Sequence, residues 1–435
     1  MDDQRFRPVS RYYPAAANHI IDDPTPKDEA IYVPSVSPGY AQAAFEKGWK
    51  RPLPRGVAPG DLNFLDPHNG LFHISHVMSS AGQALNQRKD CIITTRDRSV
   101  TTLICDSGGF QIANGNLEIN RDADRLRILR WMEQYGDYGI TLDVPTGKAG
   151  LPGYKFKSSA DCLAATLEHL DFFQRHRVSG KIKLLNVLQG NTLAQTDTWY
   201  DAVKGYHFEG WAFAGKLRHN VYAFIRRIFI MARDGLIRDR DWIHVLGTCE
   251  LDTAVLLTAL QRAINRHLNP NLRISFDTST PFRSLAFGNI FTVPNFGRSE
   301  MVMPMRRMPD SDAYSGLNVR WPWPSPLGNR MTLADVCVKN SLLAGSTYDT
   351  QANHCVAHHN LAALCWGIAL ANRVFDAESL DHNHTIGRAE GAVVELIDRV
   401  FASGSMDELD SYEISFAKLR HGKIDDTGDE DRAEA

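Results

Sequence analysis

The sequence predicts a (β/α)8 TIM barrel that carries an N-terminal extension and a C-terminal insertion or subdomain. From residue 71 onward, short apolar runs alternate with longer segments of helical period, which is the pattern of repeated βα units. Several of these runs end in a polar residue, as barrel strands do at the mouth where active sites form. The chain has 435 residues, 43% of them hydrophobic, and is long enough for one barrel-sized domain with attachments. A doubly wound sheet stays open on periodicity alone.

Seven apolar runs are short enough to be buried parallel strands. The expected strands are 71–75, 101–105, 138–144, 182–188, 211–214, 242–246 and 273–276, with an eighth strand further on. Apolar residues three and four apart predict the helices between them. The expected helices are 121–135, 158–176, 193–204, 220–234 and 252–267.

The remaining segments differ from this repeat in composition. Residues 1–70 are rich in Pro and charge without a sustained period, and we expect them to form an N-terminal extension. The barrel then spans 71–423 and contains an insertion at about 289–355, before a helix-like run at about 360–375. Residues 424–435 are acidic with almost no apolar side chains, which predicts a disordered tail.

Composition excludes several classes of protein. The formal net charge is −3, so any nucleic-acid contact must rest on local clusters of arginine rather than on a bulk positive field. Seven scattered cysteines do not form a disulfide framework, and the N-terminus does not resemble a signal peptide. No apolar run reaches the ~20 residues that span a bilayer. We expect a cytoplasmic protein (in the host cytoplasm if a virus encodes it) without a membrane partner.

Polar residues that can take part in catalysis or ligand binding follow four of the predicted strands. Asp106, Asp143, Gln189 and Asp277 each stand at or just after a strand, and in a barrel these ends converge on one mouth. Three acids and an amide there can bind a hard metal, act as an acid/base pair on a sugar, or hold a base. The glycine pair at 108–109 lets backbone approach a planar ligand closely.

Each of these residues also has a plain structural explanation. An Asp that closes a strand is commonly a helix cap or turn residue, because it satisfies unpaired N–H groups. The recurrence of such residues at corresponding ends of successive strands favours a shared site.

Several motifs, in order, resemble those of the tRNA-guanine transglycosylase superfamily, most closely the branch that inserts 7-deazaguanines into DNA. Residues 106–111 match its D-S-G-G-[FY]-Q motif, and 277–283 match D-x3-P-x-R. The turns at Gln189-Gly190, Ala214-Gly215 and Leu246-Gly247 resemble its other strand ends. The resemblance covers about residues 95–290, and a weaker similarity continues to about residue 375.

The resemblance implies a role for each matching residue. Asp277 would be the nucleophile that attacks C1′ of the target nucleotide, and Asp106 the general base for the incoming base. The implied substrate-binding residues are Asp143, Gln189 and Gly215 at the purine edge, Phe110 and Leu246 on the ring faces, Ser107 and Gln111 of the motif, and Arg283, which would touch a phosphate or orient the loop. The chemistry requires no cofactor.

The family's zinc motif is degenerate here. Of its C-x-C-x2-C spacing, only Cys337 remains between Asp335 and Asn340, with His359 as the matching histidine. Cys355 offers a substitute ligand. The side-chain amide of Asn340 would be a poor zinc ligand. The preferred interpretation is that ordinary packing holds this region and that the structural zinc is absent or altered.

Three functions remain in view. The N-terminal region and the short spacing between Asp106 and Asp143 differ from the tRNA enzymes, whereas the chemical residues are kept. This favours guanine exchange in DNA for 7-cyano-7-deazaguanine or a relative, with helper proteins that open the duplex as candidate partners. The alternative is the same exchange in tRNA, of the queuine or archaeosine type. The third is a non-catalytic nucleic-acid-binding partner subunit.

Overall fold

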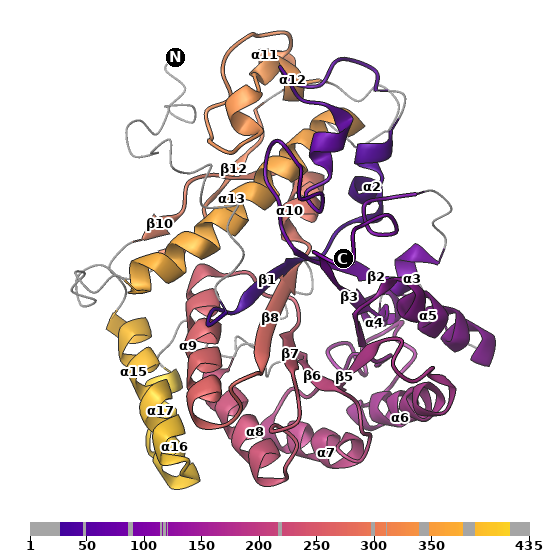
Figure 1. Cartoon of the computed structure of the whole chain (residues 1–435), viewed down its shortest axis with the longest axis vertical. Coiled ribbons are helices and arrows are strands. Elements are labelled where there is room, and N and C mark those ends of the chain that lie inside the picture. The colour runs from indigo at the N-terminus through magenta and orange to yellow at the C-terminus, as the bar shows by residue number, and fades with distance from the viewer. Residues whose placement is uncertain are drawn as a thin grey trace.

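The computed structural model describes residues 27–46, 49–85, 90–113, 115, 119, 121–215, 220–296, 301–309, 311–338, 348–376 and 388–417. Its centre is a sheet of eight parallel strands that curls into a nearly closed barrel, with helices around it (Figure 1). The strand order is β1-β8-β7-β6-β5-β4-β3-β2. The predicted (β/α)8 fold with attachments is confirmed.

The eight strands are short, as is usual in such barrels. They are β1 (Ile31–Pro34), β2 (His76–Ser80), β3 (Thr102–Asp106), β4 (Tyr138–Ile140), β5 (Lys183–Leu188), β6 (Gly210–Phe213), β7 (Trp242–Val245) and β8 (Arg273–Thr278). Six of the seven predicted strands overlap these elements. The strand expected at 71–75 is wrong, because Leu71 and Phe72 are buried outside the sheet and the strand follows them as β2.

The strand that completes the barrel comes from the N-terminal region. β1 pairs in parallel with β8, placing Val33 opposite Asp277, and a bridge from Ser35 to Met78 links it to β2. The expectation of an eighth strand after residue 276 is therefore wrong. β1 belongs to the barrel although it lies within residues 1–70.

Helices follow the strands as the periodicity predicts. The long ones are α5 (Asp122–Tyr135), α6 (Ser159–His176), α7 (Leu193–Val203), α8 (Val221–Arg233) and α9 (Leu251–His267). The short ones near the barrel mouth are α2 (Pro38–Ala41), α3 (Ala81–Ala84), α4 (Gly109–Ala113) and α10 (Thr280–Arg283). The five predicted helices between the strands are confirmed to within two residues at each end.

The C-terminal part adds a layer on one side of the barrel. Two short antiparallel pairs join β9 (Asn289–Phe291) to β12 (Met305–Arg307) and β10 (Asn295–Phe296) to β11 (Met301–Val302). The helices that follow are α11 (Ser311–Tyr314), α12 (Leu333–Val336), α13 (Thr350–Asp376), α15 (Arg388–Ser403), α16 (Met406–Ser411) and α17 (Glu413–Ala417). In Figure 1, α13 and α15 lie beside α9. The predicted acidic tail, 424–435, lies outside the described residues.

The inner face of the barrel is a separate apolar cluster. Its buried members are Ile31, Val33, Met78, Ile104, Ile140, Leu185, Val187, Ala212, Ala214 and Trp242. Because strand side chains alternate with a period of two, the next inward positions toward the strand ends include Asp106, Leu246 and Asp277. These side chains therefore lie next to the apolar interior, at the C-terminal ends of the strands.

Among the described helices, none is long and apolar enough to cross a membrane.

Candidate active site

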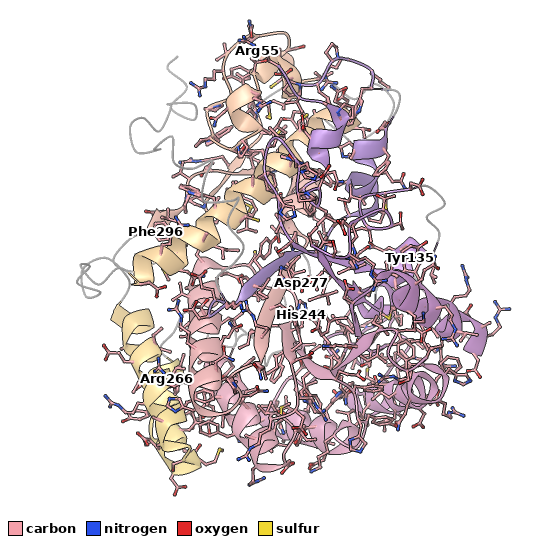
Figure 2. The ribbon with its side chains drawn as sticks, in the orientation of Figure 1. Arg55, Tyr135, His244, Arg266, Asp277 and Phe296 are labelled. Atoms are coloured by element: carbon pink, nitrogen blue, oxygen red, sulfur yellow. The ribbon has the colours of Figure 1, made fainter. Side chains whose placement is uncertain are left out.

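Asp277 is a buried carboxylate at the mouth of the barrel. It lies near the end of β8 (Figure 2) and, like Asp143, is only 6% exposed. Its Oδ1 accepts hydrogen bonds from Gly247 N at 2.9 Å and from His244 Nε2 at 3.2 Å, and its backbone carbonyl accepts one from Thr248 N at 2.7 Å. Gly247 has φ 66°, a left-handed conformation that points its N–H at the carboxylate. The two N–H donors therefore fix the orientation of this carboxyl group through Oδ1.

His244 lies beside Asp277 and is a residue that the sequence reasoning did not single out. It stands on β7 and is completely buried beneath Asp277. Its Nδ1 lies 2.7 Å from Ser275 Oγ, which also accepts a hydrogen bond from Trp242 Nε1 at 2.7 Å. A lone His in an apolar strand is read as core, and only the β7–β8 register, which sets His244 opposite Ser275, shows what it does.

Asp106 ends β3 and faces the same interior. Burial raises the pKa of its carboxyl group, and the negative charge of Asp277 raises that pKa further. Hydrogen bonds from Ser80 and from the backbone N–H of Gly108 oppose this shift. The two carboxyl groups predicted as nucleophile and general base are therefore electrostatically coupled.

Asp143 joins this group from the segment after β4. Burial raises its pKa to about 7, with the charge of Asp106 as a further cause, whereas a hydrogen bond from Gln189 lowers it. Gln189 Nε2 donates to Asp143 Oδ2, and Thr146 N and Oγ1 lie 3.5 and 3.4 Å from Gln189 Oε1. Three carboxyl groups and one amide thus act on one another at the barrel mouth.

Glycines allow the strand ends to approach this closely. A Cβ on Gly109 would stand 2.9 Å from Asp143 Oδ1 and 3.1 Å from Asp143 O. Gly215 has φ 62°, and a Cβ there would stand 2.9 Å from Gly190 O and 3.6 Å from Gln189 Oε1. No larger residue fits at either place without a shift of the neighbours.

The other predicted substrate-binding residues differ in what they do. Ser107 is buried and its Oγ donates to Thr141 O at 3.3 Å, which is a structural contact, and Gln111 Oε1 accepts from Ser80 Oγ at 3.3 Å. Leu246 packs against the apolar interior of the barrel. The side chain of Phe110 lies outside the description, so its stacking role stays a prediction. Arg283 is half-buried at the end of α10, and its phosphate contact also stays a prediction.

The degenerate zinc motif forms ordinary structural contacts. Asp335 Oδ2 accepts from Thr332 N at 2.7 Å and Thr332 Oγ1 at 2.8 Å at the start of α12. His359 is buried, with Nδ1 2.8 Å from Ser325 Oγ and Nε2 3.1 Å from Phe291 O. No group of three or more His, Cys, Asp or Glu side chains that could hold a metal occurs among the described residues. Asp335 and His359 thus already have hydrogen-bond partners, and Asn340 lies outside the described residues.

Two arginines of α8 make ion pairs with the neighbouring helix α7. Arg226 and Arg227 both donate to Asp197 on α7, and Arg227 is buried. Trp321 and Trp323 are also buried, at ring centroids 4.9 Å apart. Arg227, Trp321 and Trp323 therefore present no free surface to a nucleic acid, whereas Arg226 is partly exposed but is paired with Asp197.

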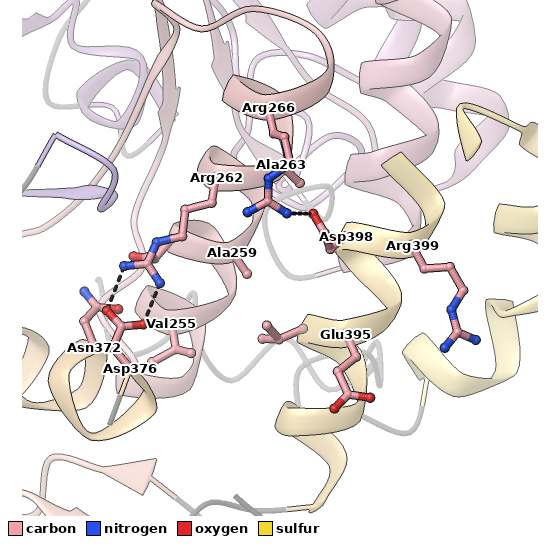
Figure 3. A pocket seen from close by; sticks show the side chains of 12 residues that line it. Val255, Ala259, Arg262, Ala263, Arg266, Asn372, Asp376, Glu395, Asp398 and Arg399 are labelled. Carbon is pink, nitrogen blue, oxygen red and sulfur yellow. Dashed lines mark hydrogen bonds and ion pairs between the residues drawn. The ribbon is translucent and has the colours of Figure 1, made fainter. Parts of the chain in front are cut away.

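A cavity of about 480 Å3 lies between α9, α13 and α15 (Figure 3). Four of its charged side chains pair across the helices: Arg262 with Asp376 at 2.6 Å, and Arg266 with Asp398. It is lined by these C-terminal helices and by α9, and none of the carboxylates at the barrel mouth lines it.

Comparison of the sequence with models of known protein families and with curated proteins finds no match.

Proposed function

We propose that this protein is a transglycosylase that exchanges guanine in DNA for a 7-deazaguanine base, 7-cyano-7-deazaguanine or a relative, through a covalent Asp-glycosyl intermediate. The observation that carries the proposal is the pairing of Asp277, a buried carboxylate with two N–H donors on Oδ1, with Asp106, a carboxyl group whose pKa burial raises. The motif resemblance assigns these two residues to nucleophile and general base.

The exchange needs two displacements at C1′ of one nucleotide. In the first, an oxygen of Asp277 forms a bond to C1′ as the C1′–N9 bond to guanine breaks, and protonated Asp106 gives its proton to the departing base. In the second, N9 of the incoming base attacks C1′, its proton passes to Asp106, and the bond to Asp277 breaks. Splitting one difficult displacement into two lowers the barrier of each. A carboxyl group with a raised pKa suits both proton transfers.

Recognition of the base falls to Asp143 and Gln189. A guanine-type edge carries two neighbouring donors, N1–H and the exocyclic amine, beside an acceptor at O6. A carboxylate accepts from the first two, and an amide or a backbone N–H donates to the third. The Asp143–Gln189 pair, with the turn at Gly215, offers this combination at one place. A base must leave the helical stack to reach it, which costs a few kcal/mol that edge contacts and stacking offset.

DNA is proposed over tRNA because the regions that differ from the tRNA enzymes are those that would position a polynucleotide. A non-catalytic role is disfavoured, because such a protein has no need of both Asp106 and Asp277. We expect the base itself and a DNA strand as partners, with helper proteins if the duplex must be opened.

The test is to express the chain in cells that make 7-deazaguanines and to analyse digested DNA and tRNA separately by mass spectrometry. The proposal predicts a 7-deazaguanine nucleoside in DNA that is absent with Asp277→Asn. Modified tRNA beside unmodified DNA would support the tRNA alternative. Nucleic-acid binding without any modified nucleoside would support the non-catalytic role.

A further inference from the structure

A chain of four hydrogen-bonding groups runs under the barrel mouth and ends on Asp277. Trp242 Nε1, Ser275 Oγ, the imidazole of His244 and Asp277 Oδ1 follow one another at 2.7, 2.7 and 3.2 Å. Ser275 and His244 are both completely buried. Water therefore does not compete with these contacts, and the partners alone decide where the protons sit.

The donor and acceptor inventory fixes the proton positions. An indole N–H can only donate, so Ser275 Oγ accepts from Trp242. Asp277 Oδ1 already accepts from Gly247 N, and as an acceptor toward the ring it requires the proton of His244 to be on Nε2. Among the described residues, His244 Nδ1 is the one recorded acceptor for the hydroxyl proton of Ser275. The lone pair on Nδ1 then accepts from Ser275, and every donor in the chain has an acceptor.

The same contacts distinguish the two oxygens of Asp277. Oδ1 receives both N–H donors, from Gly247 and His244, whereas no hydrogen bond to Oδ2 is recorded within the described part of the chain. A carboxylate oxygen with two donors is the weaker nucleophile, because those donors hold its lone pairs. Oδ2 is the oxygen left to form a bond.

We propose that His244 is a positioning residue for base exchange: its Nε2–H, oriented by the relay from Trp242 through Ser275, holds Oδ1 of Asp277 so that Oδ2 attacks C1′. This rests on the proposed function. During the first displacement Oδ1 becomes the carbonyl oxygen of the glycosyl ester. During the second, the C1′–Oδ2 bond breaks, its electron pair returns to the carboxylate, and the His244 donor stabilises the charge that reappears.

The first test is kinetic and uses a pair of matched variants. His244→Phe keeps a planar side chain but removes the donor, whereas His244→Gln keeps an amide N–H near the position of Nε2. A hydrogen bond to a charged group accounts for about a 10- to 100-fold rate effect. We expect His244→Phe to lose that much in kcat for base exchange, with KM for the free base within about twofold and a longer-lived covalent adduct, and His244→Gln to recover most of the rate.

A folded His244→Phe variant that exchanges bases within about twofold of the wild-type rate overturns the proposal, as does an equal loss in both variants. Thermal unfolding of each variant shows whether it is folded. A second measurement needs no variant to be active: long-range ¹H–¹⁵N NMR of histidine-labelled wild-type protein, with the His244 signals assigned by their loss in His244→Gln.

The NMR spectrum at pH 8 should show a protonated Nε2 and an unprotonated Nδ1, and Ser275→Ala should weaken this preference. A ring protonated on Nδ1, alone or on both nitrogens, contradicts the relay. If the wild-type protein exchanges no base in any nucleic acid, the proposed function fails and the role of His244 in exchange fails with it. The NMR result still decides separately whether the hydrogen-bond chain exists.

Discussion

Gln189 donates a hydrogen bond from its side-chain amide nitrogen to Oδ2 of Asp143 and thereby joins the ends of two neighbouring strands. The backbone N–H and hydroxyl of Thr146 face the amide oxygen of Gln189, so the amide nitrogen is the end that meets the carboxyl group. The orientation of this amide is therefore set by the protein before any base arrives. Gln189 holds Asp143 in place, and burial raises the pKa of the Asp143 carboxyl group to about 7.

The first prediction concerns stability and pH. The pKa of Asp143 is about 7 in the folded protein against an ordinary 3.8, so the folded state binds this proton more tightly than the unfolded state. That contribution to stability is complete below about pH 4 and is lost as pH rises to about 7. Each pKa unit corresponds to about 1.4 kcal/mol, which sets an upper limit near 4 kcal/mol. Asp143→Asn should therefore become more stable relative to wild type as pH rises from 4 to 7.

Urea unfolding of both proteins at pH 5, 6, 7 and 8 measures this difference. Asp239→Asn, at an exposed loop position, is the matched control and should follow the wild-type curve. A difference between Asp143→Asn and wild type that stays constant across this range would contradict the prediction.

The second prediction concerns binding of the incoming base. Protonation removes an acceptor from Asp143, so the N1–H and amine donors of a guanine-type base lose a partner below pH 7. KM for the free base should rise as pH falls below 7, approaching tenfold per pH unit. Steady-state exchange assays from pH 5.5 to 8 give this profile. In Asp143→Asn the KM should be high throughout and lack the rise, whereas a flat wild-type profile would show that Asp143 does not bind the base as proposed.

The third prediction concerns the contact between Gly109 and Asp143. The Cβ of an alanine at 109 would stand 2.9 Å from Asp143 Oδ1, so the carboxyl group or α4 must move. Gly109→Ala should cost about 1–3 kcal/mol of stability, the usual range for overpacking, and should raise KM for the base. Gly60→Ala is the control, because no atom lies within 4 Å of its added Cβ. Equal behaviour of the two variants would mean that the approach of α4 to Asp143 has no role.

Much of the fold could be predicted from the sequence, because its signals are local. Helices α5 to α9 follow from apolar periodicity within single segments. β1 could not be found in this way: it has four residues, ends in Pro34, and pairs with β8 more than 200 residues away. The pairing depends on the closure of the barrel, which leaves no trace in the local pattern.

The site shows the same division. Asp106 and Asp277 stand at strand ends in motifs that mark them, and the structure couples their charges. His244 has no motif, since its contacts, and the role proposed for it, depend on Ser275 in the next strand and on the inward alternation of both strands. The degenerate zinc motif was recognisable by spacing alone, but only the structure shows that both nitrogens of His359 already have partners.

The fourth prediction follows from those partners. Because His359 and Asp335 make structural hydrogen bonds, we expect purified protein to contain less than about 0.2 zinc per chain, and a chelator to leave its melting midpoint unchanged. A structural zinc contributes about 10–16 kcal/mol to folding in small zinc domains, so its removal would clearly lower the melting midpoint. Metal analysis and thermal unfolding with and without a chelator test this. Stoichiometric zinc that is lost in Cys337→Ser would contradict it.

The most direct test of the central claim is to trap the covalent intermediate. Purified protein is mixed with a guanine-containing DNA strand without an incoming base, denatured, and examined by gel shift and intact mass. We predict a wild-type adduct with the mass of the chain plus the strand less one guanine base, attached at Asp277 and absent from Asp277→Asn. An adduct that persists in Asp277→Asn, or that maps to Asp106, would contradict the account.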